Sequence, residues 1–149
     1  MEQKLKFEFL VSTTIHKPIA AVFDAIVNHE KLNRYFTQTA TGPMVTGTTV
    51  IWNFTDVPGD FPVHVRQVVP NELVAMEGDG KAHGYPTHSE MTFESLSANT
   101  TLLKITEVGW SPNQAGLDRS YQVCQGWTKM SCALKVFLEY GIDLRKKPY

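Results

Sequence analysis

The last third of the chain carries the clearest hydrophobic pattern. Apolar residues recur there at spacings of three and four, which is typical of one face of an amphipathic helix. These residues are Val123, Trp127, Met130, Leu134, Phe137 and Leu138. Polar residues such as Gln122 and Lys129 fall on the opposite side. The pattern therefore predicts one long C-terminal helix whose apolar face packs against a large surface.

The ends of this helix have their own signals. The segment Ser111–Gln114 offers a serine N-cap, a proline at the first helical position and a glutamine at the third. Gly141 suits a left-handed C-cap, and the basic residues 145–147 after it are expected to be a solvated tail. Glycine costs about 1 kcal/mol relative to alanine inside a helix. We therefore expect a bend near Gly116 and a close backbone approach at Gly126.

Upstream, the pattern changes to the period of two that marks half-buried strands. Alternation covers residues 4–14, and a short helix is predicted after Pro18, followed by a second over Lys31–Tyr35. Further strands are predicted at 48–54, 61–69, 73–78, 87–96 and 101–108, with a weaker one at 38–44. Turn-forming compositions separate them. The expected fold is α+β, a curved antiparallel sheet of six to seven strands wrapped around the C-terminal helix.

Composition limits the functions to consider. A length of 149 residues suits a single domain over 1–149. Lysine plus arginine number 14 against 15 aspartate plus glutamate, so the net charge of −1 does not favour nucleic acid as a partner. No apolar run approaches the ~18 residues of a membrane span. Cys124 and Cys132 fall about 12 Å apart along the predicted helix, too far for a disulfide, and we expect free thiols in a cytoplasmic protein.

Four segments carry a resemblance to a known superfamily. They are TTIHKPIAAVFDAI (Thr13–Ile26), QVVPNELV (Gln67–Val74), TLLKITEVGW (Thr101–Trp110) and GWTKMSCALKVFLEYGIDLR (Gly126–Arg145). The chain resembles the helix-grip (START/SRPBCC) superfamily, which includes START lipid-transfer domains, the birch pollen allergen and polyketide cyclases. Within it, the chain is similar to the branch related to the C-terminal domain of the activator of the ninety-kilodalton heat-shock-protein ATPase. The resemblance implies a sheet gripping the C-terminal helix around an internal, often ligand-binding cavity, and it implies no shared reaction.

Alternation predicts which side chains face that interior. Small residues on the helix flank, Ser120, Cys124 and Ser131, leave volume for a cavity, although they also suit close contacts in a filled core. The predicted ligand-binding residues are Trp52, Phe54, Val65, Met91, Phe93, Glu107, Trp110, Trp127, Met130 and Leu134.

Glu107 is the polar residue of greatest interest, because it shares parity with Leu103 and Ile105 and so points inward. A buried carboxylate needs partners. Two roles stay open: a structural hydrogen bond to backbone N–H groups at the start of the helix, and a ligand-orienting or general-acid role. Glu77, on the Leu73 and Ala75 parity, is a weaker second candidate. No catalytic residue is assigned firmly.

The histidines predict no metal site. His88 and Glu90 share the polar side of their strand, and His83 falls in the loop 80–86, where we expect it to face solvent. No histidine is placed to activate Cys124, and no motif indicates a cofactor.

Three functions follow as hypotheses. The first is a binding protein for a small, largely apolar molecule of lipid or polyketide type, monomeric or homodimeric, whose link to a stress response stays open. The second, which the resemblance implies, is a cochaperone-like module that engages a chaperone ATPase. The third is an enzyme, a cyclase, hydratase or hydrolase that uses Glu107; of the three, an enzyme is the less favoured.

Overall fold

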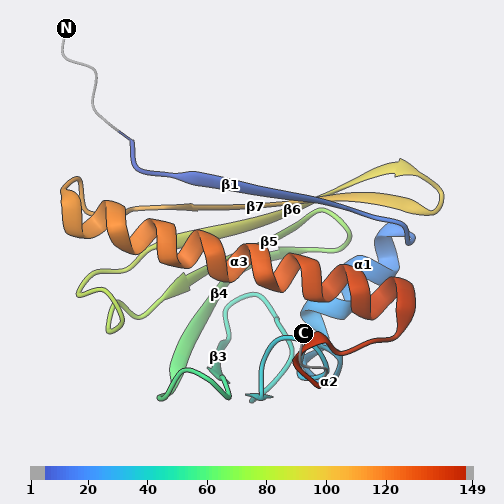
Figure 1. The fold of residues 1–149 in the computed structure, drawn as a ribbon, viewed down its shortest axis with the longest axis horizontal. Helices are drawn as coiled ribbons and strands as arrows, with labels where there is room; N and C mark the ends of the chain where they lie inside the picture. The colour runs from blue at the N-terminus through green and yellow to red at the C-terminus, as the bar shows by residue number, and fades with distance from the viewer. Residues whose placement is uncertain (1–5, 147–149) are drawn as a thin grey trace, which may run out of the picture.

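Seven strands form one antiparallel sheet in the order β1-β7-β6-β5-β4-β3-β2 (Figure 1). The structure is a computed structural model that describes residues 6–146. The strands are β1 (Phe9–Ile15), β2 (Thr39–Ala40), β3 (Thr49–Asn53), β4 (Phe61–Val69), β5 (Leu73–Gly78), β6 (His88–Ser97) and β7 (Thr100–Val108). The helices are α1 (Ile19–Val27), α2 (His29–Leu32), α3 (Gln114–Tyr140) and the short 3-10 turn η1 (Leu144–Lys146). The predicted α+β helix-grip fold is confirmed.

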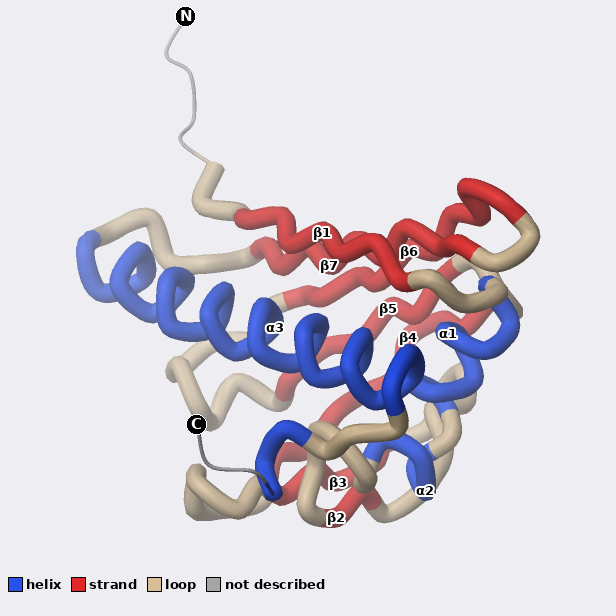
Figure 2. Tube along the Cα trace, turned by 45° about the vertical axis from the view of Figure 1, so that its right-hand side comes forward, coloured by secondary structure: helices blue, strands red, loops and turns tan. Residues whose placement is uncertain are grey.

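The sheet curls around α3, which runs across its inner face, while α1 and α2 lie at one end (Figure 2). Every predicted strand is present. The predicted start of the first strand at residue 4 lies outside the described residues, and β1 begins at Phe9. No helix within residues 6–146 is long and apolar enough to cross a membrane.

Alternation along the strands decides which side chains form the core. In β6, Ser89, Met91 and Phe93 are buried, and Glu90 and Thr92 between them are exposed. In β7, Leu103 and Ile105 are buried in the same way. Met91 pairs with Ile105 across the two strands, so the inward residues form continuous rows beneath the helix. The inward sets predicted by parity are confirmed.

The apolar face of α3 closes the core from the other side. Trp127, Met130 and Leu134 are buried in one cluster with the inward strand residues, and Phe137 packs at its edge. The Tyr35 hydroxyl donates to the carbonyl of Ala25 at 2.8 Å, and its ring stacks on Phe137 at 5.4 Å. The segment after α2 is thereby fixed against both α1 and α3.

The start of α3 differs from the sequence prediction. The N-cap is Asn113, whose side chain accepts from the Gly116 N–H at 2.9 Å, and Ser111 precedes it. The helix runs unbroken through Gly116, so the predicted bend is wrong. Gly116 instead serves close packing, because a Cβ there would lie 1.9 Å from the Ser111 carbonyl oxygen.

The predictions for the other two glycines, Gly126 and Gly141, had different outcomes. The close approach predicted at Gly126 is wrong, since nothing lies within 4 Å of where its Cβ would be. Gly141 is the predicted left-handed C-cap, with φ of 67° and its N–H bonded to the carbonyl of Phe137.

Arg145 of the predicted basic tail is exposed as expected, but its guanidinium is also hydrogen-bonded within the fold. Its guanidinium donates to the carbonyls of Thr37 at 3.0 Å and Asn33 at 2.9 Å, while also bonding Asp143. Hydrogen bonds from Arg145 hold the pKa of the Asp143 carboxyl below its usual value, although burial opposes this. Hydrogen bonds from Arg145 therefore link η1 to the segment after α2. Lys147 lies outside the described residues.

The two glycines of α3 should respond oppositely to alanine. Gly126→Ala should raise the free energy of unfolding by about 0.5–1 kcal/mol, because Gly126 is exposed mid-helix with open space beside it. Gly116→Ala is the matched control and should destabilise the protein, because its methyl group would overlap the Ser111 carbonyl. Urea unfolding of both variants measures this; equal shifts would contradict it.

Candidate functional site

Most of the predicted ligand-binding residues meet between the sheet and α3. All are buried except Phe54, which is half-buried and packs against the same core. They are Trp52, Phe54, Val65, Met91, Phe93, Glu107, Trp110, Trp127, Met130 and Leu134. Trp110 departs from the others because its ring contacts Phe9 at 6.2 Å and His83 at 5.0 Å, outside the main cluster. Whether they bind a ligand stays a prediction.

An aromatic group lies at the edge of this interior, where Phe36, Phe54 and Phe61 are half-buried against the core. The Phe36 ring lies 5.7 Å from Trp52, 5.1 Å from Phe54 and 6.0 Å from Trp127, measured between ring centroids. Phe61 extends the group at 5.6 Å from Phe54. Sequence reasoning missed Phe36, although it follows Leu32 and Tyr35 at helical spacing. The group joins β3 and β4 to α3 through edge-to-face and tilted contacts.

Two buried polar atoms, one on β3 and one on α3, lack partners. Trp52 Nε1 and Ser131 Oγ are inaccessible to solvent and make no hydrogen bond to any residue between 6 and 146. Trp52 comes from β3 and Ser131 from α3, so each layer of the grip contributes one. A buried unpaired polar group costs about 1–3 kcal/mol. Each such group calls for an explanation, such as an ordered water, a bound ligand or local strain.

Glu107 is the opposite case, a buried carboxylate with several donors. Its Oε1 accepts from the Ser89 hydroxyl at 2.7 Å and from Trp127 Nε1 at 2.8 Å, and its Oε2 accepts from the Thr87 hydroxyl at 3.0 Å. Ser89 is its register partner on β6. The Glu107 carbonyl accepts from Trp110 Nε1 at 3.3 Å. The donors to the carboxylate are side chains, whereas the structural role predicted from the sequence used backbone N–H groups.

Glu77 does not join Glu107. It lies on the face of β5 opposite to the buried Val74 and Met76. Its carboxylate bonds Arg66 at 2.9 Å and His88 at 3.3 Å. The two carboxylates therefore do not share an interior, and acid–base chemistry that uses both has no geometric support.

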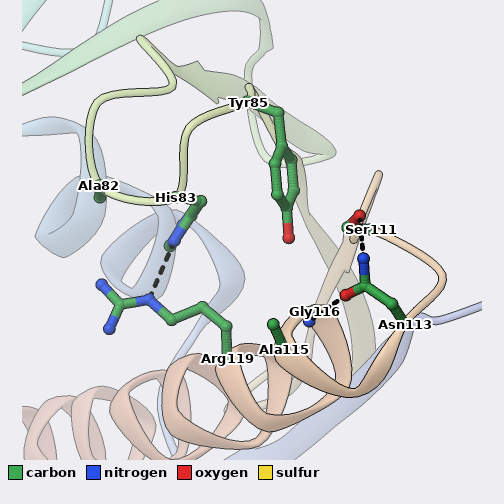
Figure 3. A pocket seen from close by; sticks show the side chains of 8 residues that line it. All are labelled: Ala82, His83, Tyr85, Ser111, Asn113, Ala115, Gly116 and Arg119. Carbon is green, nitrogen blue, oxygen red and sulfur yellow. Dashed lines mark hydrogen bonds between the residues drawn. The ribbon is translucent and has the colours of Figure 1, made fainter.

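A separate pocket of ≈ 290 Å³ opens beside the first turns of α3 (Figure 3). It is lined by Ala82, His83, Tyr85, Ser111, Asn113, Ala115, Gly116 and Arg119. The loop before β6 forms one wall and the start of α3 the other. Sequence reasoning missed this pocket, because its walls come from segments about 30 residues apart with no shared motif.

His83 and Arg119 form the polar side of the pocket. Arg119 Nε donates to His83 Nδ1 at 3.0 Å, and its Nη1 donates to Gln122 at 2.9 Å. Burial lowers the pKa of His83, the positive charge of Arg119 lowers it further, and the negative charge of Glu107 opposes both. His83 is half-buried, so the prediction that it faces solvent is wrong. Among residues 6–146, no group of three or more histidine, cysteine, aspartate or glutamate side chains is placed to hold a metal ion.

Comparison with known proteins bears on family and fold. A family model described as Activator of Hsp90 ATPase homolog 1-like protein matches residues 16–139. No curated protein matches the chain significantly.

Solved structures resemble the chain over nearly its whole length. The protein SSP2350 from Staphylococcus saprophyticus has 20% identity and a TM-score of 0.79, covering 95% of this chain and 98% of that one. An Aha1 dimer from Colwellia psychrerythraea has 20% identity and a TM-score of 0.78, covering 90% and 97%. DynU16, a putative protein in the dynemicin biosynthetic locus, has 20% identity and a TM-score of 0.78, covering 90% of this chain and 48% of that one. At these identities the likeness shows the fold.

Removing the Glu107 carboxylate should destabilise the protein strongly. Glu107→Ala leaves a cavity and three buried donors without their acceptor, so the free energy of unfolding should fall by about 2–4 kcal/mol. The control is Glu94→Ala on the exposed face of β6, which should cost less than about 0.5 kcal/mol. Chemical denaturation measures both. Similar costs for the two variants would show that the network does not support the fold.

The depressed pKa of His83 gives stability a defined pH dependence. Below its ordinary pKa of about 6.5 the unfolded chain binds a proton that the folded protein resists, so stability falls as pH falls through that value toward the folded pKa. His83→Gln should flatten this decline, whereas His88→Gln, at an exposed position, serves as control. Urea midpoints from pH 7 to 5 measure it. Parallel profiles for wild type and His83→Gln would disprove the assignment.

Proposed function

The chain belongs to the family of activator of Hsp90 ATPase homolog 1-like proteins, and from this premise we propose that it binds a small, largely apolar molecule between the sheet and α3. The ligand class is lipid- or polyketide-like. The proposed lining is the set predicted from the sequence without Trp110, which lies outside the cluster, and with Phe36 added. Tryptophan, phenylalanine and methionine dominate this lining, and small-molecule sites are typically apolar surfaces with a few placed polar groups.

The unpaired N–H of Trp52 is the observation that carries this proposal. It is a buried donor whose indole lies edge-to-face with the Phe36 ring, so an oxygen on a bound molecule would satisfy it where no described residue does. The rings of Phe36, Phe54 and Trp127 would contact the apolar body of the same molecule. The unpaired Ser131 hydroxyl supplies a second polar group from the helix side.

Glu107 contributes to this site by positioning. Its carboxylate fixes the indole of Trp127, which in turn contacts Phe36. Because both oxygens already accept hydrogen bonds from the protein, a general-acid role would require displacement of one donor. We therefore place the binding function ahead of a cyclase, hydratase or hydrolase.

The family description favours one further candidate, a module that engages a chaperone ATPase. The Aha1 dimer among similar structures makes a homodimer the arrangement to examine with it. ATP hydrolysis by a purified ninety-kilodalton chaperone, measured with and without this protein, tests the module directly. An unchanged rate at saturating protein would exclude stimulation of that chaperone.

Trp52→Phe tests the binding proposal. A neutral probe with one hydroxyl, such as a naphthol, should bind the variant about 3- to 10-fold more weakly, because one hydrogen bond to the ligand is lost while the ring remains. The fold should survive, since the deleted N–H bonds nothing described. Tyr121→Phe, at an exposed ring on α3, is the control and should leave affinity unchanged. Isothermal titration calorimetry measures binding; equal affinity for Trp52→Phe and wild type would refute a role for this N–H.

A further inference from the structure

The pocket beside α3 carries an unbalanced charge. Its lining includes one guanidinium, that of Arg119, and no carboxylate. Within the described chain, Arg119 forms no salt bridge, and the adjacent Asp118 instead accepts from Gln114 at 2.7 Å. A half-buried guanidinium without an acidic partner is a ready receptor for an anion.

The guanidinium is held in place by neutral groups. Arg119 Nε donates to His83 Nδ1, and Nη1 donates to Gln122 Oε1 one helical turn away. These two hydrogen bonds fix the plane of the Arg119 guanidinium and leave its Nη2 without a partner among residues 6–146. Because His83 Nδ1 accepts a hydrogen bond, that nitrogen carries no proton and the ring is neutral. The lining therefore presents a single positive charge.

Hydroxyl groups lie at the other end of the pocket. Figure 3 shows the Tyr85 side chain directed toward the first turn of α3, with its hydroxyl on the Ser111 side and the Arg119 guanidinium on the His83 side. The Tyr85 hydroxyl makes no hydrogen bond within the described structure, so it is free to donate. Ser111 accepts from the Asn113 amide at 3.1 Å, which leaves the Ser111 hydroxyl proton available as well.

We propose that this pocket binds the carboxylate of a small organic acid, with the Arg119 guanidinium and the Tyr85 hydroxyl as donors. The size of the pocket, ≈ 290 Å³, is at the lower limit of small-molecule sites, which span about 300–1,000 Å³, so it suits a compact acid. One positive charge matches a monoanion, whereas a phosphate dianion would remain uncompensated. This site is distinct from the proposed apolar interior, and neither proposal depends on the other.

Comparing the binding of benzoate with that of benzamide tests the proposed carboxylate site, because the two compounds differ mainly in the charged group. Titration of ¹⁵N-labelled full-length protein with each compound should show saturable shifts with benzoate at the amides of His83, Tyr85 and Arg119, and none with benzamide. Arg119→Met should weaken benzoate binding roughly 10-fold or more, since a charge-assisted hydrogen bond is removed. Tyr85→Phe should weaken it by a smaller factor while preserving the fold.

Lys129→Met is the matched control, because it removes the same charge from an exposed position of the same helix. It should leave benzoate affinity unchanged. Equal losses for Arg119→Met and Lys129→Met would show nonspecific attraction and overturn the proposal. So would tighter Arg119-dependent binding of inorganic phosphate than of benzoate, or the absence of saturable shifts. The titration with the neutral naphthol measures binding at the apolar site between the sheet and α3. A negative result at one site therefore leaves the proposal for the other site intact.

Discussion

The burial of one carboxylate connects the two layers of this protein. Glu107 carries its charge into the interior on β7, and no described cation bonds to it there. Hydroxyls from Thr87 and Ser89 and the indole N–H of Trp127 serve in place of a cation. Since a buried charge without partners would be very costly, these donors must be present together. The position of Trp127, and with it the packing of α3 on the sheet, depends on this arrangement.

The same network separates two environments. On one side lie the aromatic rings around Phe36, with the unpaired N–H of Trp52 among them. On the other, the backbone carbonyl of Glu107 holds Trp110, whose ring contacts His83 in the wall of the polar pocket. The aromatic cluster and the polar pocket thus lie on different sides of Glu107.

Local pattern was enough to predict most of the fold. Parity along a strand is a property of neighbouring residues, so it correctly placed Met91, Phe93 and Glu107 on the inner face. The helical face of α3 followed in the same way. The capping error at Ser111 arose because Ser111 and Asn113 are both good caps, and the packing of Gly116 against Ser111 depends on three-dimensional structure. Sequence spacing does not encode that contact.

The candidate site was predictable only in part, for a related reason. Glu107 was identified from its parity, but its donors were not, since Thr87 and Ser89 come from another strand and Trp127 from the helix. His83 and Arg119 are 36 positions apart and meet only because the loop before β6 folds over α3. Phe36 follows Leu32 and Tyr35 at helical spacing, but its aromatic partners Trp52 and Trp127 come from β3 and α3, which that spacing does not reveal. Residues in loops acquire their surroundings from tertiary structure, which no local rule supplies.

The hydrogen bonds that Arg145 makes to the segment after α2 affect the order in which the chain folds. Its acceptors, the carbonyls of Asn33 and Thr37, lie 112 and 108 residues earlier, and β1 likewise pairs with β7 rather than with a neighbour in sequence. Contacts of such long range close late, because the intervening loop must first be ordered. On the ribosome, β1 therefore emerges well before its partner β7, whereas α1 contacts α2 and α2 contacts β2 without waiting for distant segments.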